Sequence, residues 1–185
     1  MGRFLRIEPA AYLLGALCLY LLPFRWLMGA ISAAAVHEIY HLLALYISGV
    51  PVFSVTLGKF GAKIETGVLS TKQELFCALA GPLGSFTMLL LCTQFPEGAL
   101  WGLLQGTFNL LPVYPMDGGR VLRCLLPEKC CGIIENMVIL LLFLLCAYGG
   151  WRLKLGIEAS FPVFALAMSW CRRKIPCKAT EKAVQ

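Results

Sequence analysis

The sequence predicts an all-α polytopic membrane protein, with about six transmembrane helices and a short β-hairpin or membrane-associated strand region between the second and the third. Two observations support this fold class. Of the 185 residues, 59% are hydrophobic and 14% are charged, which lies far outside the composition of soluble globular domains. The apolar residues also gather into tracts close to the roughly 20 residues that a helix needs to cross a bilayer.

Six apolar tracts define the expected helices. In chain order they lie near Ala10–Leu22, Trp26–Ile47, Leu75–Gln94, Ala99–Leu111, Ile133–Gly149 and Leu155–Cys171. The fourth tract is too short for a plain span. Glu158 and Pro162 interrupt the sixth tract, so we expect five or six spans.

The strand region is expected within residues 49–74. Val, Phe, Thr and Ile alternate there with Ser, Lys and Glu, and glycines punctuate the stretch, which is typical of short strands joined by turns. No polar block is long enough for a separate soluble domain. We therefore predict a single membrane domain over residues 1–185, made of a preceding helix (1–25), a core (26–125), accessory helices (126–175) and a cytosolic tail (176–185).

The net charge of +6 is distributed as a membrane protein requires. If the N-terminus is cytosolic, all 16 Lys and Arg residues fall on the cytosolic side except Arg25, Arg152 and Lys154. This is the asymmetry of the positive-inside rule, so the charge needs no nucleic-acid partner to explain it. We expect a multi-pass membrane protein with both termini in the cytosol.

Small residues recur in the third tract. Ala80 and Gly84 lie four residues apart, as do Gly81 and Ser85, with Pro82 between them. This spacing lets helix backbones come into contact. We favour close packing for this stretch over a direct chemical role.

Ionisable residues interrupt the second tract, which contains the only two histidines of the chain. His37 and His41 are four residues apart, so they share one helix face and can converge on one metal ion. Glu38 is rotated about 100° from His37, where it can act on water without being a ligand. This is the H-E-x-x-H arrangement of zinc hydrolases. Because a centrally placed charge costs at least about 2.5 kcal/mol in a bilayer, a purely structural cluster is the weaker interpretation.

The third zinc ligand must come from another segment, because a catalytic zinc takes three protein ligands and one open position. The stretch "FNLLPVYPMDGGR", residues 108–120, combines a carboxylate with a proline- and glycine-broken backbone. Irregular backbone at membrane depth requires burial in protein or a water-filled cavity. Asp117 is therefore the candidate ligand at the inner end of the fourth helix, toward the cytosolic leaflet. An ordinary turn aspartate in "DGG" is the alternative.

Together these segments resemble the site-2 protease class of intramembrane zinc metalloproteases, peptidase family M50. The first motif of that family is matched by His37, Glu38 and His41. The second is matched by Asn109, Pro112, Pro115, Asp117 and Gly118. The resemblance spans about residues 30–123. Without a PDZ or CBS domain, the chain is most similar to the bacterial branch typified by the stage IV sporulation protein FB, which processes a membrane-associated pro-sigma factor.

This resemblance implies a metalloendopeptidase that acts in regulated intramembrane proteolysis, with residues 26–125 as its catalytic core. His37, His41 and Asp117 are implied to hold Zn²⁺, and Glu38 to act as general base. Asn109 is implied to donate to the oxyanion or to clamp the substrate backbone. Tyr40, Ser85 and Met116 depart from the pattern, at positions commonly occupied by a small residue, an Asn and a Leu.

The expected substrate is a membrane-tethered protein, unwound so that its peptide bonds become accessible. An extended substrate could pair with a strand edge, and we expect this edge within residues 52–64, although a membrane-surface loop is an equal alternative. The candidate substrate-binding residues are Val52, Phe53, Val55, Pro115 and Gly118. Inhibitory membrane subunits are possible partners. The rival functions are a zinc transporter or sensor, which should place more histidines or carboxylates along a path, and an inactive membrane chaperone, which has no need of Glu38.

Overall fold

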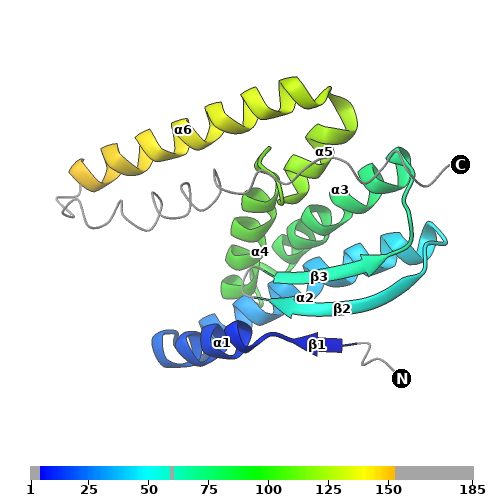
Figure 1. Ribbon diagram of the computed structural model, residues 1–185. Coiled ribbons are helices and arrows are strands. Elements are labelled where there is room, and N and C mark those ends of the chain that lie inside the picture. Colours follow the sequence, from blue (N-terminus) through cyan, green and yellow to red (C-terminus); the bar gives the residue numbers. More distant parts are fainter. Residues whose placement is uncertain (1–4, 59–60, 153–185) are drawn as a thin grey trace, which may run out of the picture. The chain divides into compact units, whose positions relative to one another are not determined.

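The computed structural model describes residues 5–58 and 61–152 (Figure 1). Its elements in chain order are β1 (Leu5–Ile7), α1 (Pro9–Leu21), α2 (Phe24–Ile47), β2 (Val52–Gly58), β3 (Gly61–Thr66), α3 (Thr71–Thr87), the 3-10 helix η1 (Met88–Leu91), α4 (Pro96–Asn109), α5 (Asp117–Leu125) and α6 (Glu128–Arg152). The chain divides into two compact units, residues 1–135 and 136–185. The first unit contains all of the predicted site residues.

Five of the expected helices are present. Pro9 and Pro96 occupy the first turns of α1 and α4, where the missing N–H costs nothing. Ser70 and Gln73 form a capping box at the start of α3. The expected helix Leu155–Cys171 lies outside the described residues.

Three described helical segments are long and apolar enough to cross a membrane: Phe24–Ile47, Thr71–Leu91 and Glu128–Gly149. The second of these combines α3 with η1. A membrane protein is therefore supported by three spans, while six spans remain a sequence prediction.

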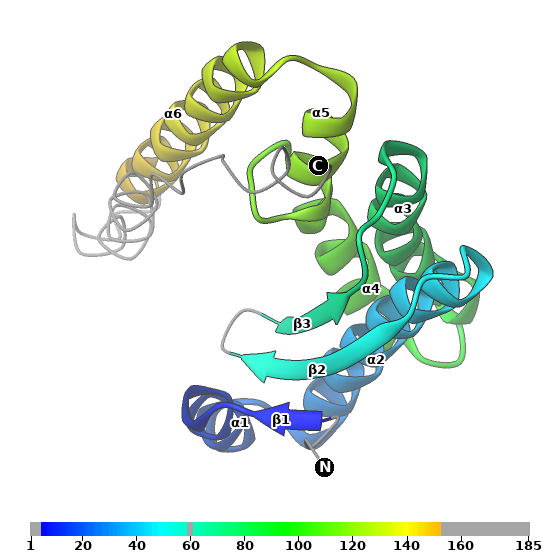
Figure 2. The ribbon, with the colours of Figure 1, turned by 45° about the vertical axis from the view of Figure 1, so that its right-hand side comes forward.

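A three-stranded sheet, in the order β1-β2-β3, combines one strand that precedes α1 with two strands that follow the long helix α2. The predicted strands between the second and third helices are β2 and β3, which pair antiparallel, and Figure 2 shows them running beside α2. Gly49 makes the turn from α2 into this sheet with φ of 68°, a conformation that glycine adopts without strain. Strand β1, which the sequence did not predict, pairs parallel with β2.

The core of the first unit lies where α2, α3 and the sheet meet. Ala44 and Leu45 of α2 pack with Val50, and with Cys77 and Ala80 of α3. Tyr40, Val52, Ile64 and Leu69 cover this cluster. It fixes α3 and the hairpin against the helix that carries both histidines.

Helix α4 approaches α3 through a row of glycines spaced by four, Gly98, Gly102 and Gly106. A Cβ at Gly102 would lie 2.5 Å from the backbone oxygen of Ser85, closer than side chains tolerate. Small residues at this spacing let membrane helices pack backbone to backbone. This row of glycines therefore brings α4, and with it the segment that follows α4, next to α3.

Candidate metal centre

The two histidines continue a buried stripe along α2. Gly29, Ala33, His37 and His41 recur every four residues, and all four are buried. The first two are small, which lets α4 pack closely: a Cβ at Gly29 would lie 2.9 Å from the backbone of Glu97. The stripe therefore places both imidazoles inside the helix bundle and not in lipid.

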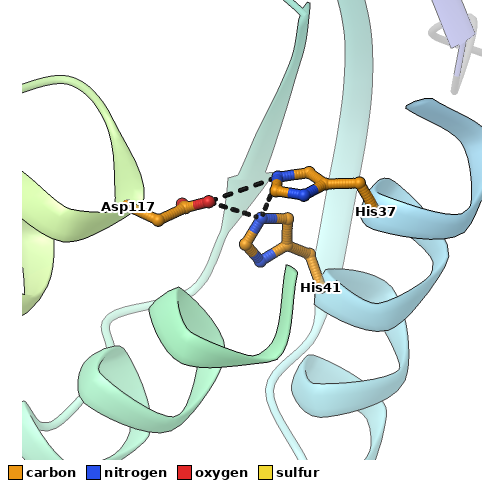
Figure 3. Close-up of side chains that lie close together, drawn as sticks. All are labelled: His37, His41 and Asp117. Atoms are coloured by element: carbon orange, nitrogen blue, oxygen red, sulfur yellow. Dashed lines mark hydrogen bonds and ion pairs between the residues drawn. The ribbon is translucent and has the colours of Figure 1, made fainter. Parts of the chain in front are cut away.

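Three side chains from two distant segments meet at this stripe, as Figure 3 shows. The Nε2 atoms of His37 and His41 are 3.1 Å apart, and each lies 3.2 Å from Oδ2 of Asp117. All three residues are buried. Among the described residues, they form the group of three donors that could hold a metal ion.

The other ring nitrogen of each histidine is held by α3. Nδ1 of His41 lies 2.8 Å from the carbonyl oxygen of Cys77. A carbonyl can only accept, so this nitrogen carries a proton, and in the neutral ring, the form that binds a metal, Nε2 keeps a free lone pair. Nδ1 of His37 lies 2.8 Å from the hydroxyl of Ser85, which accepts a hydrogen bond from the ring N–H when Nε2 is a ligand. Such partners orient metal-binding imidazoles.

Gly81 shows how closely α3 supports the two rings. A Cβ at this position would overlap Nε2 of His41 and lie 2.8 Å from Cε1 of His37. A methyl group there would occupy space that the imidazoles need. The small residues of the third helix therefore serve close packing, as expected, and that packing is against the site itself.

Asp117 reaches the histidines from the start of α5 (Asp117–Leu125). The sequence predicted a position at the inner end of the fourth helix; instead, α4 ends at Asn109 and residues 110–116 form an irregular connection. A Cβ on Gly118 would overlap the carbonyl of Leu110, and one on Gly119 would overlap the backbone of Val113 and Tyr114. The two glycines thus let α5 begin directly against this connection, which fixes the direction of Asp117.

Oδ2 of Asp117 shows that the site suits a cation. Within the described part of the chain this oxygen is buried without a hydrogen-bond partner, yet it faces two imidazole nitrogens. With the ring protons on the Nδ1 atoms, three lone-pair donors face one another without a hydrogen between them, which is costly in a buried site. Zinc ligands at about 2.0–2.1 Å from a tetrahedral ion lie about 3.3 Å apart, close to the observed separations. The donor set therefore fits Zn²⁺.

The charge of Asp117 is also that of a metal ligand. Burial alone would raise the pKa of this carboxyl, but in the metal-free site hydrogen bonds and positive charge from His37 and His41, present when their Nε2 atoms carry protons, outweigh burial and lower the pKa to about 2. Asp117 lies outside the three candidate spans. It is therefore ionised at neutral pH, the form that binds metals.

Glu38, the predicted general base, is half-buried beside the sheet. Its Oε1 accepts a hydrogen bond of 3.4 Å from the N–H of Ala62 on β3. Asn109 is the last residue of α4, and its side-chain amide donates to the carbonyl of Gln105 at 3.1 Å, one turn back in the same helix. The roles of both residues stay predictions.

The predicted substrate-binding residues fall into two places. Val52, Phe53 and Val55 lie on β2, the central strand, and Val55 pairs on both sides, with Leu5 and with Ile64. A substrate strand therefore finds no open edge at Val55. Pro115, which follows a cis peptide bond, is exposed, whereas Gly118 is buried against Leu110.

Sequence reasoning did not assign three contacts of the histidine rings. These are the hydrogen bonds to the Cys77 carbonyl and the Ser85 hydroxyl, and the close packing of both rings against Gly81. Ser85 was noted only for close helix packing and as a departure from the family pattern, although it is fully buried and its hydroxyl contacts His37. The spacing of Cys77, Gly81 and Ser85, four residues each, places them on one helix face. That spacing was the available signal.

Comparisons with known proteins agree with this geometry. No protein-family model matches the chain. A zinc metalloprotease of Methanocaldococcus jannaschii is 32% identical over 111 residues, covering 52% of this chain and 33% of the relative. Candidate zinc metalloproteases of Synechocystis sp. and of Mycobacterium tuberculosis (Rip3) are each 33% identical, covering 53% and 55% of this chain and 32% of each relative. The chain spans about a third of the length of these relatives.

A solved structure decides the fold. The site-2 protease from Methanocaldococcus jannaschii superposes with a TM-score of 0.61, over 93% of both chains, at 22% identity. This chain has a site-2 protease fold. Together with the relatives named as zinc metalloproteases, the fold supports the family resemblance and Zn²⁺ as the metal of the His37–His41–Asp117 group.

Proposed function

We propose that the protein is an intramembrane zinc metalloendopeptidase that cleaves membrane-associated or single-span proteins. The observation that carries this proposal is the convergence of three lone-pair donors from α2 and α5, with Glu38 next to one of them in the sequence. When bound, zinc would polarise the scissile carbonyl and lower the pKa of water. His37, His41 and Asp117 would hold it.

Glu38 is proposed as the general base that takes a proton from the attacking water and returns it to the leaving amine. Its carboxylate has no role as a ligand in the three-donor group. The hydrogen bond from Ala62 keeps the side chain at the β3 side of the site. Asn109 is proposed to donate to the oxyanion or to the substrate backbone, after leaving its contact with Gln105.

The substrate is proposed to bind as an extended strand at the outer edge of β3. Among the described residues, β3 pairs only with β2. The N–H of Ala62 points to Glu38 and therefore away from β2, and alternate residues of a strand point the same way. The backbone of Ile64 is thus the next group that a substrate strand could bind. A peptide on this edge would pass the proposed base.

The proposed type of substrate is a membrane-associated pro-sigma factor, because the chain resembles the bacterial branch typified by the stage IV sporulation protein FB. The protein is proposed to lie in a bacterial-type cell membrane, with its termini and the metal centre toward the cytosol, and to be open to control by inhibitory membrane subunits. The distribution of Lys and Arg along the chain supports this orientation.

The test compares the wild type with Glu38→Gln in liposomes that contain a panel of single-span reporters, including a membrane-associated pro-sigma factor. We expect the variant to bind as much zinc as the wild type and to cleave at least about 100-fold more slowly, since general base catalysis contributes that much or more. Glu97→Gln is the matched control, because Glu97 pairs with Arg25 and not with the metal group. Normal cleavage by Glu38→Gln would disprove the assigned base. Zinc uptake by the liposomes without cleavage would favour a transporter.

A further inference from the structure

Arg120 connects the metal centre to a second helix. It lies one turn after Asp117 on α5, and its Nη1 lies 3.4 Å from Oδ1 of Asp117. Its Nε donates a 2.7 Å hydrogen bond to Oε1 of Glu74, in the first turn of α3. About 30% of the Arg120 and Glu74 side chains is exposed, compared with 8% of Asp117. The guanidinium thus links two carboxylates at the edge of the buried site.

The two oxygens of Asp117 have separate partners. Oδ2 faces the histidines, and Oδ1 faces Arg120. A carboxylate that rotates freely could offer either oxygen or both to a metal ion. Contact with Arg120 on the outer oxygen selects the orientation in which one oxygen points to the histidines, because a guanidinium holds a carboxylate in a defined direction.

Glu74 determines how Arg120 can act. The short bond to Nε holds the guanidinium toward α3, so only one of its nitrogens reaches Asp117. Without Glu74, the guanidinium could turn fully onto Asp117 and bind both oxygens in the bidentate manner that arginine favours. That arrangement would compete with a metal ion for the carboxylate.

Helix α3 therefore supports all three donors. It holds His41 through the Cys77 carbonyl and His37 through Ser85. Asp117 lies on a different helix and is reached from α3 through Glu74 and Arg120. We propose that Arg120, restrained by Glu74, is a positioning residue that sets the orientation of Asp117 as the third zinc ligand. This inference rests on the metal centre of the proposed function.

The test is the zinc affinity of the purified full chain, measured by competition with a chromogenic chelator. We expect Arg120→Gln and Glu74→Gln each to weaken zinc binding by about tenfold to a hundredfold, the usual effect of losing an outer partner of a ligand. The double variant should lose little more zinc affinity than either single variant, because Glu74 acts on Asp117 only through Arg120. Arg120→Lys should recover only part of the affinity, since an ammonium lacks the planar fork that meets two carboxylates.

Arg123→Gln is the matched control. Arg123 lies on the same helix and also pairs with a carboxylate, but its contacts are Glu135 and the ring of Tyr114 and not a metal ligand, so we expect zinc affinity within about twofold of the wild type. Thermal unfolding of the metal-free proteins separates a loss of fold from a loss of positioning. The visible spectrum of bound Co²⁺ reports the ligand geometry directly and should change in Arg120→Gln and not in Arg123→Gln.

The outcomes separate this inference from the metal centre itself. If the wild type binds no zinc, or if His41→Ala binds it normally, the metal centre is wrong. If the wild type binds zinc and His41→Ala does not, but either Arg120→Gln or Glu74→Gln keeps wild-type zinc affinity, then Arg120 and Glu74 do not position Asp117. Should Arg120→Gln fail to fold, Glu74→Gln still decides the question, because it leaves Arg120 in place.

Discussion

The histidine pair and Asp117 reach the same metal group by different routes. His37 and His41 lie on one regular helix, and each ring is fixed by a single hydrogen bond to the neighbouring helix α3. Asp117 follows an irregular connection and begins a helix of nine residues. Its direction depends on two glycines packed against backbone and on an arginine paired with a second helix.

This difference separates two kinds of ligand. The histidines are preorganised by helical spacing and by local packing, which cost little to maintain once α2 and α3 have docked. Asp117 instead depends on how its short helix packs against other segments, through Gly118 and Gly119 against residues 110–114 and through Arg120 paired with Glu74. A change that moves both imidazoles should therefore weaken zinc binding more than a change in the contacts of Asp117.

The largest expected effect comes from Gly81→Ala. The added methyl group would occupy the position of Nε2 of His41 and crowd the ring of His37, so both imidazoles must move. We expect zinc affinity to fall by at least about 100-fold, beyond the loss of one outer partner. The same chelator competition measures it, and an affinity within a few-fold of the wild type would show that the rings are not held against Gly81.

Gly132→Ala is the control for this substitution. Gly132 lies in α6, and a methyl group added there would meet no atom within 4 Å, so the change should leave zinc binding unaltered. Alanine is favoured over glycine in a helix by about 1 kcal/mol. The control should therefore unfold at the same or a slightly higher temperature.

A smaller effect is expected for Ser85→Ala. Removing the hydroxyl leaves Nδ1 of His37 buried without a partner, and the ring can then turn or carry its proton on Nε2, where it blocks a metal ion. We expect a loss of zinc affinity of about tenfold, with the fold intact. Ser32→Ala is the matched control, because the Ser32 hydroxyl donates to carbonyls of its own helix and, among the residues described, to no other group. Equal affinities in the two variants would remove Ser85 from the metal centre.

The sequence predicted the helix that carries His37 and His41 more completely than the segment around Asp117, for a physical reason. The spacing of His37 and His41 and the apolar residues around them are local signals. The start of α5 at Asp117 is not local: Gly118 and Gly119 disfavour a helix on their own, and this one forms because its glycines fit against residues 110–114. The expectation that broken backbone would continue through Gly118 and Gly119 at the inner end of the fourth helix was therefore wrong, while the fold does bring Asp117 to the two histidines.

The strand region also contains a contact between distant segments that the sequence did not predict. Alternation predicted β2 and β3, but not which edge would be covered. Three residues near the N-terminus, Leu5–Ile7, pair with β2, and a strand so short and so far away in the sequence leaves no periodic signal. This pairing makes β3 the available edge, so the proposed substrate strand moves from Val55 toward Ile64.

The central claim is that one zinc ion is held jointly by α2 and α5. The direct measurement is the zinc content of the purified full chain, determined by elemental analysis after dialysis at a fixed free zinc concentration, for the wild type, His41→Ala and Asp117→Ala. We predict one zinc per wild-type chain and a large loss in both variants. A wild type without zinc, or Asp117→Ala that keeps the full amount, would contradict the claim.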